Sequence, residues 1–429
     1  MGEPCAAHPD GAASGFHNGH ELLAALASRQ QRPVAAHLQV ADRCNHACAH
    51  CYQVQGERGE LTFDEVCAVL DRLAAAGVLL LNVSGGEATL RDDLVAILRA
   101  ARRRGFALRL YTNAFLIDDA LAGEIASVGL LEAHVSLYSD VAAHHDAVTR
   151  VPGSWERTVR GVRALRARGV RVVLKAPATA LTPGGAAGVA RLAESLGCRV
   201  IASSEITPRE DGSLETLKVA AAPEALVRDG LLRPWVPSEG DEALRRKKIG
   251  TGACGVGTKS VVVLANGDVQ ACTDTPVLLG NLVEGSWDDV VSSPEVPFFH
   301  ALTWGDVHGC RDCDLLPACA RCHASALHEA GDYLGPYPSA CARARARYAA
   351  GVGGVELLPP APGCDAARSA AVGPYTIESP GRLRPIPDVR TALDEDRAQR
   401  HPWLRRAPGE RVSLVPLRLR KNAAPNGVT

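Results

Sequence analysis

The sequence has no apolar stretch long enough to cross a bilayer, since its longest apolar run lies at residues 78–83. Its first residues also lack the basic head and apolar core of a signal peptide. Neither sign of charge predominates, because 47 Lys and Arg stand against 48 Asp and Glu. A chain without a global field is not expected to bind nucleic acid or an anionic membrane. We therefore expect a cytoplasmic protein.

Cysteine is missing from residues 68–197, although the chain has 14 cysteines in all. Three of them lie within residues 44–51 and four within residues 310–322. A disulfide framework is typical of secreted proteins, and no signal peptide is present. Clustered thiols in a reducing compartment indicate metal binding instead.

Residues 34–204 alternate between apolar, strand-like runs and amphipathic helical stretches. The strands are expected near 36–40, 78–83, 106–111, 131–137, 170–176 and 199–203, and the helices near 62–76, 92–103, 118–127, 155–168 and 184–196. This alternation predicts an α/β fold with a parallel sheet and right-handed crossovers. The length favours a partial (β/α)6 barrel over a complete eight-stranded one. The active site is then expected at the carboxyl ends of the strands.

The remaining segments are predicted from composition. They are a loose leader at 1–33 with a short helix near 21–28, a linker with a helix at 205–250, a cysteine-rich domain at 251–345, and a tail at 346–429. Within the cysteine-rich domain, Ser260–Cys272 reads as a hairpin that turns at Asn266-Gly267. The tail is rich in Pro, Ala and Arg, and we expect it to be poorly ordered or to wrap the surface.

Cys44, Cys48 and Cys51 directly follow the first predicted strand. Three thiolates this close can hold three irons of a four-iron cluster and leave the fourth iron open. The CxxxCxxC spacing resembles that of the radical S-adenosylmethionine (SAM) superfamily. The resemblance implies a [4Fe–4S] cluster that cleaves SAM reductively to a 5′-deoxyadenosyl radical. Spacing alone leaves open a zinc knuckle with a histidine as fourth ligand.

A second motif, Gly85-Gly86-Glu87, ends the second predicted strand. Glycines let the backbone approach a ligand, and a carboxylate can accept a hydrogen bond from an ammonium group. The family resemblance implies that this segment holds the SAM amino group, although Ala88 replaces the usual proline. It also implies SAM contacts for three further residues, namely His50, Asn113 and Ser136. We interpret His144-His145-Asp146 as a solvated helix start rather than a metal site.

Seven further cysteines follow a distinctive order, namely Cys254, Cys272, Cys310, Cys313, Cys319, Cys322 and Cys341. This order resembles the SPASM domain, which binds two auxiliary iron–sulfur clusters. The resemblance assigns Cys310, Cys313, Cys319 and Cys341 to one cluster, and Cys254, Cys272 and Cys322 to the other, whose fourth ligand stays unassigned. The short Cys319-x2-Cys322 spacing departs from the usual three residues. A pair of zinc ribbons is the alternative.

Enzymes with this C-terminal domain mostly modify peptides or proteins, so the resemblance implies a maturase of a ribosomally made peptide. In sulfatase-maturing relatives, an aspartate that acts as a base directly follows the hairpin cysteine. Here Thr273 occupies that position, and the side chain of Asp274, one place later, is expected to point away from it. The few residues before the first strand lead us to expect a leader bound by a separate protein or by the barrel. A reductant such as ferredoxin or flavodoxin is also implied. Two alternatives stay open: modified-haem biosynthesis, and a non-catalytic iron–sulfur or zinc scaffold.

Overall fold

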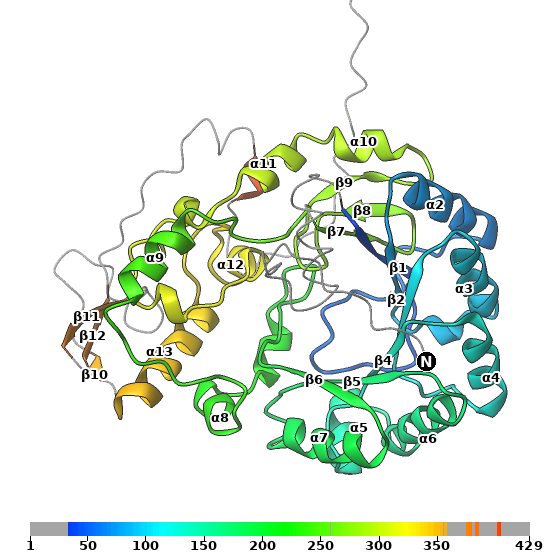
Figure 1. Cartoon of the computed structure of the whole chain (residues 1–429), viewed down its shortest axis with the longest axis horizontal. Helices are drawn as coiled ribbons and strands as arrows, with labels where there is room; N and C mark the ends of the chain where they lie inside the picture. The colour runs from blue at the N-terminus through cyan, green and yellow to red at the C-terminus, as the bar shows by residue number, and fades with distance from the viewer. Residues whose placement is uncertain are drawn as a thin grey trace, which may run out of the picture.

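The main sheet of the protein has nine strands in the spatial order β6-β5-β4-β3-β2-β1-β7-β8-β9. The computed structural model describes residues 33–257, 259–354, 356–357, 375–379, 382–385 and 401–404. The two ends of the sheet are not paired with each other, so it forms an open, curved wall (Figure 1). Helices cover its outer face, which leaves the concave face and the carboxyl ends of the strands for a site.

Six of these strands are parallel and alternate with helices. The strands are β1 (Ala35–Ala41), β2 (Leu80–Gly85), β3 (Ala107–Thr112), β4 (Glu132–Ser136), β5 (Val172–Pro177) and β6 (Arg199–Ser203). Between them lie α2 (Phe63–Ala75), η1 (Ala88–Leu90), α3 (Leu94–Arg103), α4 (Asp119–Val128), α5 (Ala142–Thr149), α6 (Ser154–Ala167) and α7 (Gly185–Ser195). Each predicted strand and helix of this region lies within two residues of the observed bounds. The predicted partial barrel is confirmed.

Burial follows the predicted patterns. On α2, the four residues Val66, Val69, Leu70 and Leu73 are fully buried and form its apolar stripe. The helix begins at a capping box in which Thr62 and Glu65 satisfy each other's backbone N–H groups. These helical stripes pack on the outward-facing apolar residues of the sheet and form one continuous core.

The C-terminal cysteine-rich part extends the same sheet. Strand β7 (Ser260–Val263) pairs in parallel with β1, and β8 (Asp268–Gln270) and β9 (Leu278–Asn281) continue it in antiparallel fashion. The predicted hairpin is present, with Gly267 at φ 89° in its turn. Because Val261 and Val263 belong to the same core cluster as the barrel residues, the two predicted domains share a core.

The remaining described elements surround the cysteines. They are η2 (Glu215–Val219), α8 (Pro223–Arg228), α9 (Asp241–Ile249), α10 (Trp287–Val291), α11 (Glu295–Ala301), η3 (Trp304–Asp306), η4 (Leu316–Ala318), α12 (His323–Ala330), α13 (Pro338–Val352) and η5 (Pro402–Leu404). A small separate sheet is formed by β10 (Glu356–Leu357), β11 (Tyr375–Ser379) and β12 (Arg382–Pro385). In the described part of the chain, no helix combines the length and apolar character that crossing a bilayer requires.

Two predictions meet the limits of the described residues. The leader at 1–33, with its helix near 21–28, falls almost wholly outside them, as does most of the tail at 346–429. Helix α13 continues to Val352, past the predicted domain end at residue 345. The linker at 205–250 contains two α-helices and a 3-10 turn where one helix was expected.

Candidate iron–sulfur and SAM site

The loop that carries Cys44, Cys48 and Cys51 lies at the carboxyl end of β1. Its backbone is anchored on the end of α5, because Ala47 and Ala49 donate their N–H groups to the carbonyls of Thr149 and Val148 (3.2 and 2.8 Å). The N–H of Cys51 donates to the carbonyl of Cys48 at 3.0 Å, which makes a tight turn between these two thiols. The loop is therefore held from outside, and its three side chains are left to face one another.

These three thiols are largely shielded from water. Burial, together with the charges of other thiols of the loop, raises the pKa of Cys44 to about 11 and that of Cys48 to about 12. Burial also raises the pKa of Cys51. Thiols in such surroundings are neutral unless a cation compensates their charge, and a bound metal does so. The donor set and its surroundings fit an iron–sulfur cluster.

The Gly85–Glu87 turn lies directly against this loop. Gly86 and Glu87 donate their N–H groups to the carbonyls of Ala41 and Arg43 (2.8 and 3.0 Å). A Cβ on Gly86 would lie 2.3 Å from the oxygen of Arg43 and 3.0 Å from the Cβ of Cys44. Only glycine allows this approach, so the predicted neighbourhood of the two motifs is present.

The Glu87 side chain joins the ends of two strands rather than facing solvent, since the residue is 1% exposed. Its Oε1 accepts hydrogen bonds from the N–H and hydroxyl of Thr89 (3.0 and 2.7 Å) and from the hydroxyl of Thr112 (2.6 Å). Its Oε2 accepts one from the N–H of Asn113 at 2.6 Å. The carboxylate thus fixes the end of β3 against the turn after β2.

Asn113 in turn reaches the cysteine loop, because its Nδ2 donates to Oδ1 of Asn45 at 2.7 Å. Ala114, which follows it, has a positive φ of 57°, a conformation that favours glycine. Alanine at such a φ carries a conformational cost, which could not be foreseen from the sequence.

The end of β4 completes the site. Ser136 hydrogen-bonds the hydroxyl of Tyr138, and that hydroxyl lies 3.9 Å from the Sγ of Cys48. The ring of His50 meets the ring of Tyr138 edge-on at 4.8 Å. The predicted SAM-binding residues therefore lie around one set of thiols, and Tyr138 joins them as a residue that the motif comparison did not single out.

The His144-His145-Asp146 segment is partly different from its prediction. It lies in helix α5, but His145 is buried rather than solvated. Its Nδ1 accepts the N–H of Tyr138 at 3.2 Å, and its ring stacks on that of Tyr138. Asp146 accepts the N–H groups of Gly153 and Trp155, so the segment is structural and buttresses the site.

The C-terminal cysteines include two sets of thiols that influence one another's pKa values. The pKa of Cys341 is raised well above its usual value by burial and by the charges of Cys310, Cys319 and Cys313, so these four are neighbours. Burial raises the pKa of Cys272 to about 12 and that of Cys322 to about 11, and Cys254 contributes to both shifts. Among the described residues, no three His, Cys, Asp or Glu side chains converge tightly on a single-ion position.

Three residues connect the cysteine loop with the second group. Tyr52 follows Cys51 and accepts the N–H of Glu210 at its carbonyl (2.9 Å). Asp274 hydrogen-bonds Thr207, and its pKa is raised to about 6 by burial and by the charges of Glu205 and Glu210. Its charge also acts on Tyr52, Cys272 and Cys322.

The charge of Asp274 therefore acts both on Tyr52, which follows Cys51, and on the Cys272 and Cys322 thiols. The long linker folds back onto the loop after Cys51, a contact that sequence separation conceals. Nothing in the sequence marked Glu210 as a residue near the site. Tyr52 could have been recognised, because it directly follows the third cysteine.

The concave face of the sheet is unusually polar below the site. His37, Tyr111 and His134 from β1, β3 and β4 form a row, with ring centroids 5.6 and 4.6 Å apart. Nδ1 of His134 is buried and has no hydrogen-bond partner among the residues that the structure describes. Lys175, on β5, is half-buried near Arg109, and both burial and that neighbouring charge lower its pKa. A barrel interior is ordinarily filled by branched apolar side chains, so this face is suited to a polar ligand.

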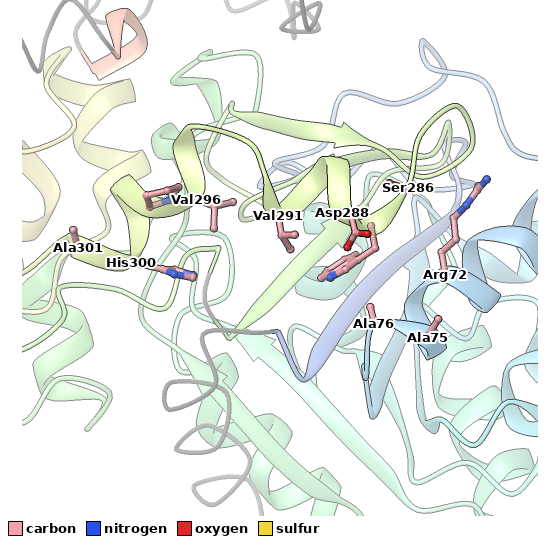
Figure 2. A pocket seen from close by; sticks show the side chains of 11 residues that line it. Arg72, Ala75, Ala76, Ser286, Asp288, Val291, Val296, His300 and Ala301 are labelled. Atoms are coloured by element: carbon pink, nitrogen blue, oxygen red, sulfur yellow. The ribbon is translucent and has the colours of Figure 1, made fainter.

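A hollow on the surface lies elsewhere. A depression of about 870 Å³ lies between the last turn of α2 and helices α10 and α11 (Figure 2). It is lined by Arg72, Trp287 and His300 among mostly small apolar residues. Because the last turn of α2 leads into the amino end of β2, this depression opens at the opposite edge of the sheet from the cysteine loop.

Comparison with known families agrees with this geometry. The model of the radical SAM superfamily matches residues 38–183, and that of the SPASM iron–sulfur cluster-binding domain matches residues 254–323. The chain belongs to the radical SAM superfamily. It is an enzyme of the radical SAM–SPASM type, whose cofactors are SAM and [4Fe–4S] clusters.

The curated relatives of this radical SAM protein carry names that state different activities. An AdoMet-dependent heme synthase of Methanosarcina barkeri is 28% identical over 69% of this chain and 92% of its own. The mycofactocin maturase MftC of Mycobacterium ulcerans is 26% identical over 67% of this chain and 82% of its own.

Solved structures share the fold. SuiB of Streptococcus suis bound to S-adenosylmethionine aligns with a TM-score of 0.54 and 14% identity, over 75% of this chain and 81% of its own. The AdoMet-bound anSMEcpe aligns with a TM-score of 0.51 and 15% identity, over 68% of this chain and 91% of its own.

Proposed function

We propose that this radical SAM enzyme modifies a ribosomally made peptide or protein. The observation that carries the proposal is the presence of two sets of buried thiols in the C-terminal part, beside the thiols of the cysteine loop. Further support comes from MftC, a maturase by name, and from the fold of SuiB, which has been solved with its precursor peptide SuiA. A leader would be bound by a separate protein or by the barrel, and a ferredoxin or flavodoxin would supply electrons.

In this proposal Cys44, Cys48 and Cys51 hold the SAM-binding cluster. That cluster, when bound and reduced, supplies the electron that cleaves SAM to methionine and a 5′-deoxyadenosyl radical. The ligands of the auxiliary clusters are Cys310, Cys313, Cys319 and Cys341 on one side, and Cys254, Cys272 and Cys322 on the other. Their burial fits this role, because metal binding compensates the cost of a buried thiolate.

The family resemblance implies which residues lie around SAM, and their contacts within the protein support the roles proposed for them. Gly85 and Gly86 give the backbone access to the SAM amino group, and Glu87 positions that turn through its bonds to Thr112 and Asn113. His50 and Ser136, on either side of Tyr138, contact the adenosine portion. Each of these residues binds or orients, and none needs to transfer a proton.

Modified-haem biosynthesis is the second candidate. The heme synthase of Methanosarcina barkeri matches this chain over 92% of the synthase's own length. In addition, Arg109 and Lys175 on the concave face could pair with the propionate carboxylates of a tetrapyrrole. An acidic peptide side chain would suit the same two cations.

One experiment separates these functions. The anaerobically reconstituted protein is reduced and given SAM, and 5′-deoxyadenosine is measured with peptides encoded beside its gene and, separately, with iron-coproporphyrin III. A mass change in a peptide supports the proposal, whereas loss of carboxyl groups from the porphyrin supports the second candidate. Cys48→Ala should abolish 5′-deoxyadenosine formation, and Cys67→Ala, which removes a helix α2 thiol outside all three groups, should not.

A further inference from the structure

Tyr138 carries a hydroxyl group into a buried part of the site. The residue follows β4 and is only 6% exposed. A buried hydroxyl costs free energy unless it is hydrogen-bonded, so phenylalanine would fill this space at lower cost if packing were the only requirement. The hydroxyl of Tyr138 is hydrogen-bonded by Ser136 and lies 3.9 Å from the Sγ of Cys48. The contact with Cys48 joins two segments that are 90 residues apart in the sequence.

Two histidines hold the ring of Tyr138 in place. One face of the ring stacks on His145, with centroids 5.2 Å apart and 22° between the planes, and the ring of His50 meets it edge-on at 4.8 Å. The backbone N–H of Tyr138 also donates to Nδ1 of His145 at 3.2 Å. Stacked and edge-on contacts of this kind restrict how an aromatic ring can turn. The hydroxyl is therefore directed toward the cysteine loop by contacts on both the ring and the backbone.

Helix α5 anchors both sides of the contact between Tyr138 and Cys48. His145, which holds the tyrosine, belongs to this helix. Cys48 is flanked by Ala47 and Ala49, and both of these residues donate their N–H groups to carbonyls at the end of the same helix, at 3.2 and 2.8 Å. One helix therefore brings the hydroxyl and the sulfur together from two distant segments of the chain.

We propose that Tyr138 is a positioning residue whose hydroxyl donates a hydrogen bond to the Cys48 sulfur and thereby makes the SAM-binding cluster easier to reduce. An iron-bound thiolate has no proton and can only accept, and its charge strengthens the bond that it accepts. Reduction adds one electron, taken from an external reductant, and no proton leaves the tyrosine. A donor directed at a ligand sulfur stabilises the added negative charge. The proposal rests on Cys48 as a cluster ligand and on the reductive chemistry of the proposed function, and not on the identity of the substrate.

The reduction potential of the cluster tests this role. In a redox titration of the anaerobic, full-length holoprotein followed by electron paramagnetic resonance, the SAM-binding cluster is the signal that changes when SAM is added. In Tyr138→Phe, the ratio of oxidised to reduced cluster at a fixed potential should rise about ten-fold, which for a one-electron couple is a shift of about 59 mV to lower potential. The signals of the auxiliary clusters should not move.

The matched control is Tyr111→Phe, which removes a hydroxyl from the neighbouring strand β3, where the ring packs on His37 and His134. It should change the same ratio less than about two-fold. An unchanged potential in Tyr138→Phe protein with its full iron content would overturn the proposal. If that variant binds less iron, replacement of Tyr138 by 3-fluorotyrosine decides instead. Its more acidic phenol is a stronger donor, so the potential should rise above that of wild type, and an unchanged or lower potential would refute the proposed hydrogen bond.

The choice of reductant gives a second readout. With dithionite, at potentials where the cluster is mostly oxidised, Tyr138→Phe should form 5′-deoxyadenosine about ten-fold more slowly than wild type. With titanium(III) citrate, a stronger reductant, the two rates should converge. A deficit of equal size with both reductants would show that Tyr138 shapes the SAM pocket and not the potential, and the proposal would be wrong. The titration needs no substrate, so failure of the proposed function, seen as unmodified peptide, leaves its outcome intact. Absence of any SAM-sensitive signal in wild type would remove Cys48 as a cluster ligand, and the proposal with it.

Discussion

At the scale of single residues, Gly86 packs closely against the backbone of the cysteine loop. Gly86→Ala should push Arg43 and Cys44 away, because the new methyl group would lie 2.3 Å from a backbone oxygen that cannot move alone. We expect the variant to retain less iron at the first cluster and to lose SAM affinity by about ten-fold or more. Iron analysis and equilibrium dialysis with labelled SAM measure both.

Gly240→Ala is the matched control for this change. Gly240 precedes α9 at a negative φ of −76°, and a Cβ there would meet nothing closer than 3.8 Å. It should leave iron content and SAM affinity unchanged. Wild-type SAM affinity in Gly86→Ala would show that the glycine turn does not set the position of Cys44.

A second residue-scale prediction concerns pH and His145. Burial lowers its pKa to about 4. Its Nδ1 accepts the N–H of Tyr138, so a proton added to Nδ1 would lie against the hydrogen of that N–H. A histidine whose folded pKa lies below its unfolded value of about 6.5 stabilises the fold above that pH, and this stability is lost as pH falls toward 4. The loss attributable to His145 is on the order of 3 kcal/mol.

His145→Asn tests the argument, since an amide oxygen can accept the same N–H but cannot titrate in this range. Urea unfolding between pH 7 and pH 4 should show a flatter decline than in wild type. The neighbouring His144→Asn, on the same helix but not buried, should follow the wild-type curve. Identical slopes for all three proteins would contradict the assignment of the pH dependence to His145.

At the scale of elements, sequence periodicity predicted the barrel well because each strand and helix there has its own apolar pattern. Helix α5 was only partly predicted, since Ala142–Thr149 has no continuous apolar stripe and its buried face is made by His145, Val148 and Thr149. The pairing of β1 with β7 could not be predicted, because a strand's pattern does not tell which distant edge it joins. The positions of Glu210 and Asp274 could not be predicted either, because local sequence patterns do not tell which distant segments meet.

The hairpin of β7 and β8 gives the element-scale prediction. Its turn residue Gly267 has a φ of 89°, and a Cβ there would approach Val283 to 2.7 Å. Gly267→Ala should destabilise the hairpin by about 1–2 kcal/mol and loosen Cys254 and Cys272, which flank it. We expect less auxiliary-cluster iron, while SAM still binds. Mössbauer spectroscopy with and without SAM distinguishes the cluster that SAM contacts from the others.

The control is Gly230→Ala, which also places alanine at a positive φ of 74° but meets no atom within 4 Å. It lies after α8, and the added methyl group would meet no described atom, so it should reproduce the conformational cost without the loss of iron. Equal iron loss in both variants would mean that general destabilisation, and not the hairpin, controls the auxiliary site.

At the scale of the whole molecule, the barrel and the cysteine-rich part are joined by one sheet and one core, although two family models match them separately. Separating them would expose the edge of β1 together with Val261 and Val263, which are now buried. We therefore predict that they unfold together. Calorimetry of the anaerobic holoprotein should give one transition whose van't Hoff and calorimetric enthalpies agree.

Removal of the clusters gives a second test of this prediction. Thiol sites that bind metal only when folded add their binding free energy to folding stability, so oxidative removal of iron should lower the melting temperature of the single transition. Because β7–β9 complete the wall beside β1, both family regions should be affected, and protease sites in the barrel and the C-terminal part should open at the same temperature. Two resolved transitions, with the barrel unfolding at its original temperature, would show that the shared sheet does not couple the two regions.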